Sequence, residues 1–435
     1  MKKFILPLLA GISLVSCKQE FTNPGAINSS SAFSTPRTLA GVAVGLQNVY
    51  SNGRLSPVYT SVTAAGALTN EYRLMNVGNT DEANLFIGGP AVDNLNGIVG
   101  NMWTWNNKII FDADNVINGA KTLGDKNTAA GLIAYATIFK ALAIGNLAMY
   151  FEQIPSAPGS ATEPARFQTR IEGFRRAVAA LRASQALLTA TPPGSTFYSN
   201  VPTSIDINFL TNTTNALIAR YSLFAGDFAD AITASNAVPP TYAGALLGFD
   251  AVVPNPVFNT VTNTNNVYQI LDSTLGLPTA LAPDLTDARI PFYTSINATV
   301  NPRYRIRGFY SGLTQSVPLY VPDEMRLIRA EALVRQAAPN LAGAVTEINA
   351  VRTQTPAADP LGIGGSGTNY TGTVDAPSLL AEIYRQRCIE MCMSGMRLED
   401  SRRLGRPVSE RKRNFFPYPT RERDNNPNTP ADPSF

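Results

Sequence analysis

The residue types that most often carry catalytic chemistry are scarce in this sequence. Histidine is absent from all 435 residues, which removes the commonest general base and excludes Ser-His-Asp and Cys-His hydrolysis. Besides Cys17, the only cysteines are Cys388 and Cys392. Two thiols without histidine are too few for a zinc site. We expect Cys388 and Cys392 to be free thiols on one helix face, and a strained disulfide is the alternative.

Acidic and glycine-rich segments offer two further kinds of site, and neither is well supported. A glycan hydrolase needs two carboxylates that face each other in a cleft. The pairs Asp81-Glu82 and Asp323-Glu324 are better explained as loop charge and as a helix N-terminus, respectively. GIGGSG at 362–367 lacks the lysine of a phosphate-binding loop. We therefore expect no enzyme, no cofactor and no metal site, with calcium binding by loop oxygens left open.

Composition indicates a globular protein without affinity for nucleic acid. Hydrophobic residues make up 44% of the chain and charged residues 15%, which is enough apolar material for a large core. Lysine and arginine exceed the acids by three, so bulk charge gives little attraction for a polyanion.

The first seventeen residues have the pattern of a secretion signal. Lys2 and Lys3 precede a short apolar run at 4–15, and LVSC at 14–17 looks like a bacterial lipobox. We predict a signal peptide at 1–16, a lipid on Cys17 and a polar tether at 17–34. The alternative is an ordinary secretory signal with a coincidental cysteine.

Apolar residues recur at steps of three and four in paired segments, which predicts helical hairpins. Gly226-Asp227 in the middle of one pair predicts a helix stop followed by an N-cap. That pair is similar to a tetratricopeptide repeat, a unit that gains stability by stacking on its neighbours. The pairs lie at 132–150 with 167–181, 217–224 with 228–238, and 325–332 with 341–351.

We predict one mainly α domain over 35–435, in which tetratricopeptide-like hairpins form a scaffold. The remainder is rich in Pro, Gly, Asn and Thr and should form a loop-rich second face that carries the binding residues. Short strands are expected around 304–309 and 317–321. The scaffold comprises 35–50, 105–238, 322–353 and 377–404, and the loop-rich face comprises 51–104, 239–321 and 354–376.

Several of these segments resemble the SusD/RagB family of outer-membrane nutrient-uptake lipoproteins. GLIAYATIFKALAIGNLAMYFEQIP (131–155) is similar to that family's Ala-rich helix, and NALIARYSLFAGDFADAITASNAV (215–238) to its repeat helix pair. DEMRLIRAEALVRQ (323–336) and AVTEINAVRTQ (344–354) resemble its late hairpin. The resemblance extends over nearly the whole chain from Cys17.

The C-terminal segments carry the most specific part of the resemblance. EIYRQRCIEMCMSGMRLEDSRRLGRP (382–407) and NFFPYPTRERDNNP (414–427) resemble the family's Arg-rich helix and its closing segment. Ser394, Met396 and Leu398 depart from the family pattern, whereas Arg387, Glu390, Gly395, Arg397, Asp400 and Arg403 fit it. Spacing by three places Arg397, Asp400 and Arg403 on one helix face, and we expect them to pair with each other rather than bind ligand.

The resemblance implies a non-catalytic lipoprotein anchored in the outer membrane. Such a protein captures a glycan or similar nutrient at the cell surface and delivers it to a SusC-like TonB-dependent transporter. Two alternatives stay open: a helical-repeat lipoprotein that acts only as a scaffold, and a SusD-like binder of peptide or another nutrient.

Candidate ligand residues follow from the chemistry of sugar recognition, which uses aromatic faces and hydrogen-bonding side chains. Trp105 shares a helical stripe with Ile109 and Ala113, which favours a core position. Trp103 lies off that stripe and is the favoured platform, with packing as its alternative. The candidates form two regions: Tyr59, Asn70, Tyr72, Arg73, Asn101, Trp103 and Trp105, and then Tyr268, Phe292 and Tyr293.

Overall fold

The computed structural model describes residues 33–160, 162–264 and 266–435. The predicted signal peptide, the predicted lipid acceptor Cys17 and the predicted tether as far as residue 32 lie outside the described residues. The described chain consists mainly of α-helices with a few short strands, which confirms the predicted fold class.

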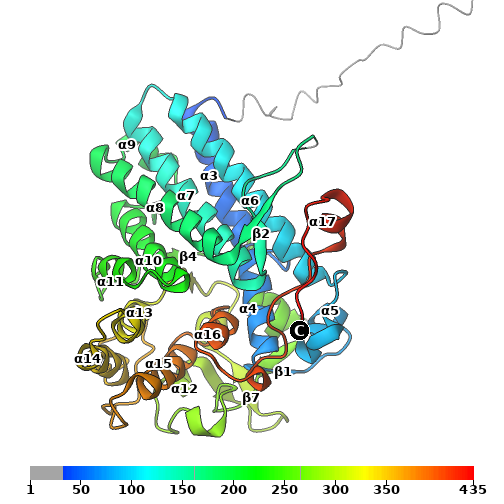
Figure 1. Ribbon diagram of the computed structural model, residues 1–435, viewed down its shortest axis with the longest axis vertical. Helices are drawn as coiled ribbons and strands as arrows, with labels where there is room; N and C mark the ends of the chain where they lie inside the picture. The colour runs from blue at the N-terminus through cyan, green and yellow to red at the C-terminus, as the bar shows by residue number, and fades with distance from the viewer. Residues whose placement is uncertain (1–32, 161, 265) are drawn as a thin grey trace, which may run out of the picture.

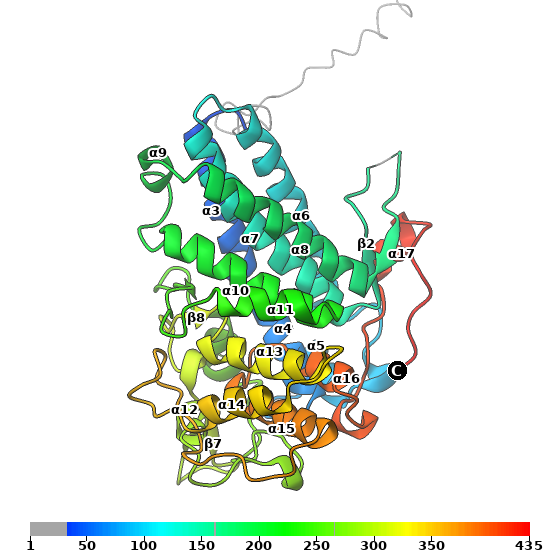
Figure 2. The ribbon, with the colours of Figure 1, turned by 60° about the vertical axis from the view of Figure 1, so that its left-hand side comes forward.

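The long helices form a stack of successive hairpins, each packed on the next (Figures 1 and 2). This arrangement confirms the predicted hairpins, and it buries apolar faces that a single hairpin would leave in water. The stack contains α3 (Pro36–Ser51), α6 (Gly97–Thr122), α7 (Lys126–Tyr150), α8 (Arg170–Ala190), α10 (Ile207–Ala225), α11 (Phe228–Asn236), α13 (Pro322–Arg335), α14 (Leu341–Arg352) and α15 (Ala376–Glu390).

Helix α7 lies at the centre of the upper part of the stack. It packs against α3, α6, α8 and α10, and it is long and apolar enough to cross a membrane, yet 89% of its most apolar window is buried inside the protein. Core packing therefore accounts for its composition. Small residues allow close approach: a methyl group at Gly145 would overlap the Tyr221 ring of α10.

The α10–α11 hairpin turns at Gly226, as predicted. Gly226 adopts φ +83°, a left-handed conformation that glycine accommodates without strain. Asp227 occupies the N-cap position of α11, but its side chain does not cap the helix. Its carboxylate instead accepts hydrogen bonds of 3.1 Å from Arg175 Nε and Nη2, which connects this turn to α8.

The prediction of a loop-rich segment at 51–104 is wrong. The segment contains α4 (Pro57–Leu68), in which every residue is buried, then α5 (Thr80–Ile87) and the start of α6. A helix buried on all sides has no polar stripe, so its sequence shows no helical periodicity. Glu82 is also not loop charge, because it is buried in α5 and accepts hydrogen bonds from Tyr59 and Arg54.

The second face contains short strands, as predicted, among loops and the short helix α12 (Arg289–Tyr293). Another short helix, α9 (Ser195–Tyr198), packs instead on α7 and α3 of the upper helices. Residues 354–375 form neither helix nor strand. The strands pair antiparallel in twos: β1 (Tyr72–Leu74) with β5 (Tyr268–Ile270), β2 (Gln153–Pro155) with β3 (Phe167–Thr169), β4 (Leu246–Leu247) with β8 (Val317–Pro318), and β6 (Thr294–Ile296) with β7 (Tyr304–Ile306).

The charged residues of α15 and α16 (Arg397–Arg403) form buried ion pairs. Asp400 accepts from Arg387 Nε at 2.9 Å and from Arg403 Nη2 at 2.7 Å, so the predicted pairing of Asp400 with Arg403 is confirmed. Arg397 differs from the prediction, because its guanidinium points to Glu71, 3.7 Å away. Cys388 and Cys392 are free and buried, as expected.

After α16 the chain returns across the molecule to the upper helices. Lys412 N–H donates to the Leu68 carbonyl at 3.0 Å, and Phe416 N–H donates to the Tyr150 carbonyl at 2.9 Å. The segment ends in α17 (Thr420–Asn425), which lies beside α6 and the β2–β3 ribbon (Figures 1 and 2). This return brings residues near 420 to residues near 100.

Candidate functional site

Trp103 is mainly a packing residue, which does not favour its predicted role as the ligand platform, although it also lines one of the surface hollows described below. Its side chain is 4% exposed, and its ring contacts the rings of Phe151, Phe167 and Tyr418 at centroid distances of 4.7–6.0 Å. Its indole N–H donates to Glu422 Oε2 at 3.0 Å. The polar edge of the ring is therefore occupied by Glu422, and one face is stacked on Phe167.

The hydroxyl group of Tyr418, a member of the aromatic cluster around Trp103, bonds to the backbone of β2. Burial raises the pKa of Tyr418 to about 12, so its hydroxyl stays protonated at neutral pH. That hydroxyl donates to the Gln153 carbonyl at 3.2 Å and accepts from the Gln153 N–H at 3.1 Å. The closing segment of the chain is thus attached to β2 beneath the candidate site.

The four candidate tyrosines are also buried, which does not favour their predicted contact with ligand. Each is at most 1% exposed, and none offers a ring face to solvent. Tyr59 donates to Glu82 at 2.7 Å, Tyr293 donates to the Glu390 carbonyl, and the rings of Tyr72 and Tyr268 stack with centroids 5.2 Å apart.

The structure does bring the two predicted regions together, but inside the core. β1 and β5 pair so that Tyr72 lies opposite Ile270 and Leu74 opposite Tyr268. Of the remaining candidates here, Asn70 occupies a turn with φ +64°, Arg73 is exposed on β1, and Phe292 packs edge-on against Tyr293 and Phe309. These three do not converge on a described hollow.

Asn101 and Trp105 line one surface hollow, and Trp103 lines the neighbouring one. Asn101 and Trp105 lie one turn apart on α6, so their side chains project from the same face. The hollow that they line has a volume of about 410 Å³, and its walls include Leu95, Thr104 and Arg421. Trp105 is half-buried. We call this cavity the Trp105 hollow.

A second hollow lies further along α6 and shares Thr104 and Arg421 with the first. Its volume is about 360 Å³, and its lining includes Phe111, which is 52% exposed, and Pro158 of the β2–β3 loop. The two hollows together form a groove on the outer face of α6, which we call the α6 groove.

The C-terminal segment positions the far wall of the groove. Thr420 N–H donates to the Asn94 carbonyl at 3.0 Å, which joins the start of α17 to the loop before α6. Glu422 accepts from Trp103 and, at 2.7 Å, from Asn426. With its flanking residues attached in this way, Arg421 is directed along the groove between the two hollows.

We compared the sequence and the structure with those of known proteins. No family model and no curated protein matches the sequence. Among solved structures, a SusD superfamily protein from Bacteroides thetaiotaomicron superposes with a TM-score of 0.71 at 14% identity, over 92% of this chain and 100% of its own. A putative sugar binding protein from Bacteroides vulgatus gives 0.69 at 14% identity, over 92% and 98%.

A SusD-like carbohydrate binding protein from Bacteroides fragilis gives a TM-score of 0.67 at 13% identity, over 91% of this chain and 99% of its own. The chain has a SusD-like fold. The resemblance seen in the sequence is therefore confirmed for the fold, and the structural match extends across both the helical stack and the second face.

The lining of the α6 groove combines aromatic rings with polar side chains. The indole of Trp105 supplies a flat apolar face, while Asn101, Thr104 and Arg421 supply donors and acceptors around it. Among the residues that line the α6 groove, Glu422 is the sole carboxylate. A pair of catalytic carboxylates is therefore not present among these lining residues.

Sequence reasoning found one wall of the groove and missed the other. The missed residues, Leu95, Thr420 and Arg421, are contributed by the loop before α6 and by a segment more than 300 positions later in the chain. No local pattern signals that contact. The exposed hydrophobic Leu95, which is 73% exposed, follows polar Asn94 and resembles an ordinary loop residue in the sequence.

Proposed function

We propose that this chain is a non-catalytic binding protein that captures an oligosaccharide in the α6 groove. The observation that carries the proposal is the half-buried indole of Trp105 in the wall of a 410 Å³ hollow, one helical turn from Asn101. Two of the structural neighbours are described as sugar or carbohydrate binding proteins, which supports the same ligand class.

The chemistry of the groove supports recognition of a sugar ring. A pyranose has an apolar face of C–H groups, which stacks on an aromatic ring, and a rim of hydroxyl groups, which bond to amides and guanidinium groups. Trp105 supplies the aromatic ring, and Asn101 and Arg421 supply the rim contacts. Both hollows are open at the surface, which suits a ligand longer than one sugar unit.

We further propose that the protein is anchored to the outer membrane by a lipid on Cys17 and delivers its ligand to a SusC-like TonB-dependent transporter. The lipobox at 14–17 and the polar stretch that follows it support the anchor. Extraction in mild detergent should recover the protein together with a large β-barrel partner. Recovery as a monomer, under conditions that preserve other outer-membrane complexes, would contradict the transporter proposal.

Calorimetry against a panel of neutral oligosaccharides tests the binding proposal. We expect micromolar to millimolar affinity, or about 4–8 kcal/mol, because a delivery protein must release its ligand. Trp105→Ala should weaken binding by about 1 kcal/mol, roughly fivefold, through loss of the stacking face. The control is Tyr370→Ala, which removes a half-buried aromatic ring outside the groove and should leave affinity unchanged.

Two outcomes would redirect the proposal. If a glycan binds and Trp105→Ala retains full affinity, the α6 groove is not the binding site. If no glycan binds, while peptides do, the protein is a SusD-like binder of peptide rather than of sugar. Absence of any ligand, with an intact transporter complex, would favour the scaffold alternative.

A further inference from the structure

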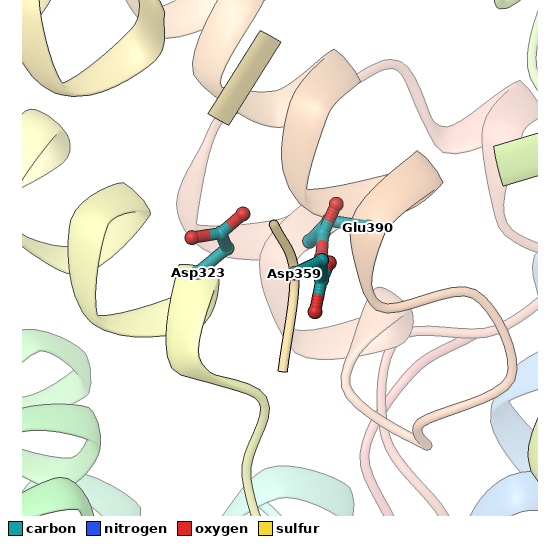
Figure 3. Close-up of side chains that lie close together, drawn as sticks. All are labelled: Asp323, Asp359 and Glu390. Carbon is teal, nitrogen blue, oxygen red and sulfur yellow. The ribbon is translucent and has the colours of Figure 1, made fainter. Parts of the chain in front are cut away.

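Three carboxyl groups from separate segments meet in the interior of the lower part of the molecule. Asp323 lies in the first turn of α13, Asp359 in the loop after α14, and Glu390 at the end of α15 (Figure 3). Each offers an oxygen atom, and these atoms lie within 4.8 Å of one another. The three residues are 3%, 8% and 0% exposed, respectively.

Glu390 has a buried oxygen atom without a hydrogen-bond partner. Its Oε2 accepts a long hydrogen bond of 3.3 Å from Arg289 Nη1, whereas its Oε1 has no partner among the described residues. Arg289 itself donates its shorter bonds, of 2.9 and 2.7 Å, to Asp287. A buried carboxylate oxygen without a donor is costly, and either protonation or a cation at that position relieves the cost. Glu71 and Glu331 also carry such an oxygen, and Glu390 differs from them in belonging to the acidic cluster.

The charges around the cluster do not balance. Four acids lie together here: the three cluster members and Asp287. They are contacted by two guanidinium groups, those of Arg289 and Arg326, and Arg326 is also within 4.0 Å of Glu347. With all four acids ionised, two negative charges remain uncompensated in a buried environment, which one divalent cation would neutralise.

The side chains are arranged as oxygen ligands. Asp359 is oriented by the N–H groups of Leu361 and Gly364, which donate to its two carboxylate oxygens at 2.8 and 3.0 Å. The Gln354 amide adjoins Asp323, and with its nitrogen inward it lies 2.8 and 3.0 Å from the Asp323 oxygens. Rotated by half a turn, the amide presents an oxygen to the cluster instead.

We propose that Asp323, Asp359 and Glu390 bind one Ca²⁺ ion, with the Gln354 amide oxygen as a further ligand. Ca²⁺ takes oxygen ligands at about 2.3–2.6 Å, so two oxygens on opposite sides of the ion are separated by roughly 4.6–5.2 Å. The cluster oxygens all lie within 4.8 Å of one another, so all three are close enough to reach one such ion. Mg²⁺ needs about 2.0–2.1 Å to each ligand and hence a tighter cluster.

The site would connect the loop after α14 to two helices of the stack. Residues 354–375 lack regular structure, and backbone hydrogen bonds of Gly365 and Gly367 join them to Ala288 and to Arg352 at the end of α14. The ion would add a crosslink from this loop to α13 and α15. The cluster lies among α13, α14 and α15, away from α6 and α17 (Figure 1). Its role is therefore structural, and the inference is independent of the proposed function.

Titration of the chelator-treated full-length protein with CaCl2 tests the site. We expect one ion bound per chain by calorimetry and a rise in Tm on the order of 3 °C or more at saturating Ca²⁺. Asp359→Asn should weaken Ca²⁺ binding at least tenfold, and Glu390→Gln should do the same. The control is Asp284→Asn, because Asp284 is an exposed acid outside the cluster, and this variant should bind Ca²⁺ like the wild type.

Asp359→Asn is the decisive variant, because Asp359 lies in a loop and its replacement leaves the helix contacts of Glu390 in place. The proposal is overturned if the wild type shows neither heat nor a Tm shift with Ca²⁺, or if Asp359→Asn binds Ca²⁺ as tightly as the wild type. An equal or larger shift with MgCl2 would overturn the choice of Ca²⁺.

Discussion

Arg220 of α10 donates two parallel hydrogen bonds, each 2.6 Å long, to the carboxylate of Glu324 in α13. Their side chains are 7% and 0% exposed. Arg220 also donates to the Leu319 carbonyl at 2.9 Å. This bidentate pair therefore joins the upper helices to the late hairpin and to the loop that precedes it.

Removal of one partner of this pair should destabilise the protein strongly. Glu324→Gln leaves the Arg220 charge buried without compensation, and we expect a loss of about 3–5 kcal/mol in the free energy of unfolding. Urea denaturation measures the loss. The double variant Arg220→Met/Glu324→Met, which removes both charges, should recover most of it. A loss below about 1 kcal/mol in Glu324→Gln would show that the pair contributes little.

Low pH should reduce the free energy of unfolding through protonation of Asp400 in α16. Burial would raise the pKa of Asp400, but Arg387 and Arg403 outweigh burial and hold that pKa below its ordinary value of 3.8. A carboxyl group with a lowered pKa in the folded state stabilises the protein above its unfolded-state pKa, and this contribution is lost as pH falls through the folded-state pKa.

We therefore expect the free energy of unfolding to fall steeply below about pH 4, and less steeply in Asp400→Asn. Chemical denaturation at a series of pH values provides the slopes. The same reasoning applies to Glu399, whose pKa is lowered by Arg170 and Arg402 despite burial. Equal slopes in wild type and Asp400→Asn would show that Asp400 does not govern acid stability.

Gly→Ala substitutions should have opposite effects on stability at a closely packed glycine of α7 and at an exposed glycine of α3. Gly145→Ala adds a methyl group that overlaps the Tyr221 ring, and overpacking should cost about 1–3 kcal/mol. Gly41 is exposed in α3 with no atom within 4 Å of an added methyl group. Gly41→Ala should instead stabilise the protein by about 0.5–1 kcal/mol. Thermal unfolding of both variants measures the change in Tm relative to the wild type. A Gly145→Ala variant as stable as the wild type would contradict the prediction.

The lipid anchor predicts a simple change in partitioning. Wild-type protein should fractionate with outer membranes and incorporate a fatty-acid analogue, whereas Cys17→Ala should be soluble or remain unprocessed, because acyl chains provide the membrane affinity. Metabolic labelling followed by fractionation gives both readings. Label that persists in Cys17→Ala would reject the assignment of Cys17 as the acceptor.

The local sequence was sufficient to predict the helical hairpins. Helices α8 and α14 show the helical period because each buries one face against a neighbour. Helices α7 and α10 are buried on nearly all sides, and their long stretches without proline were recognisable as helices. Gly226 was identifiable as a helix stop for a local reason as well, since a left-handed residue favours glycine. Helix α4 was missed because its complete burial removes the periodic signal.

The placement of the binding groove depended on the tertiary structure. Trp103 and Trp105 are two residues apart on α6, and spacing along the helix favoured Trp105 for the core. The returning C-terminal segment decides otherwise, because Tyr418 and Glu422 cover Trp103 from more than 300 residues away. Trp105 is left in the wall of the groove with Arg421. Such a contact has no local sequence signal, since it depends on the folded chain bringing residues 418–422 back to residues 103–105 of α6.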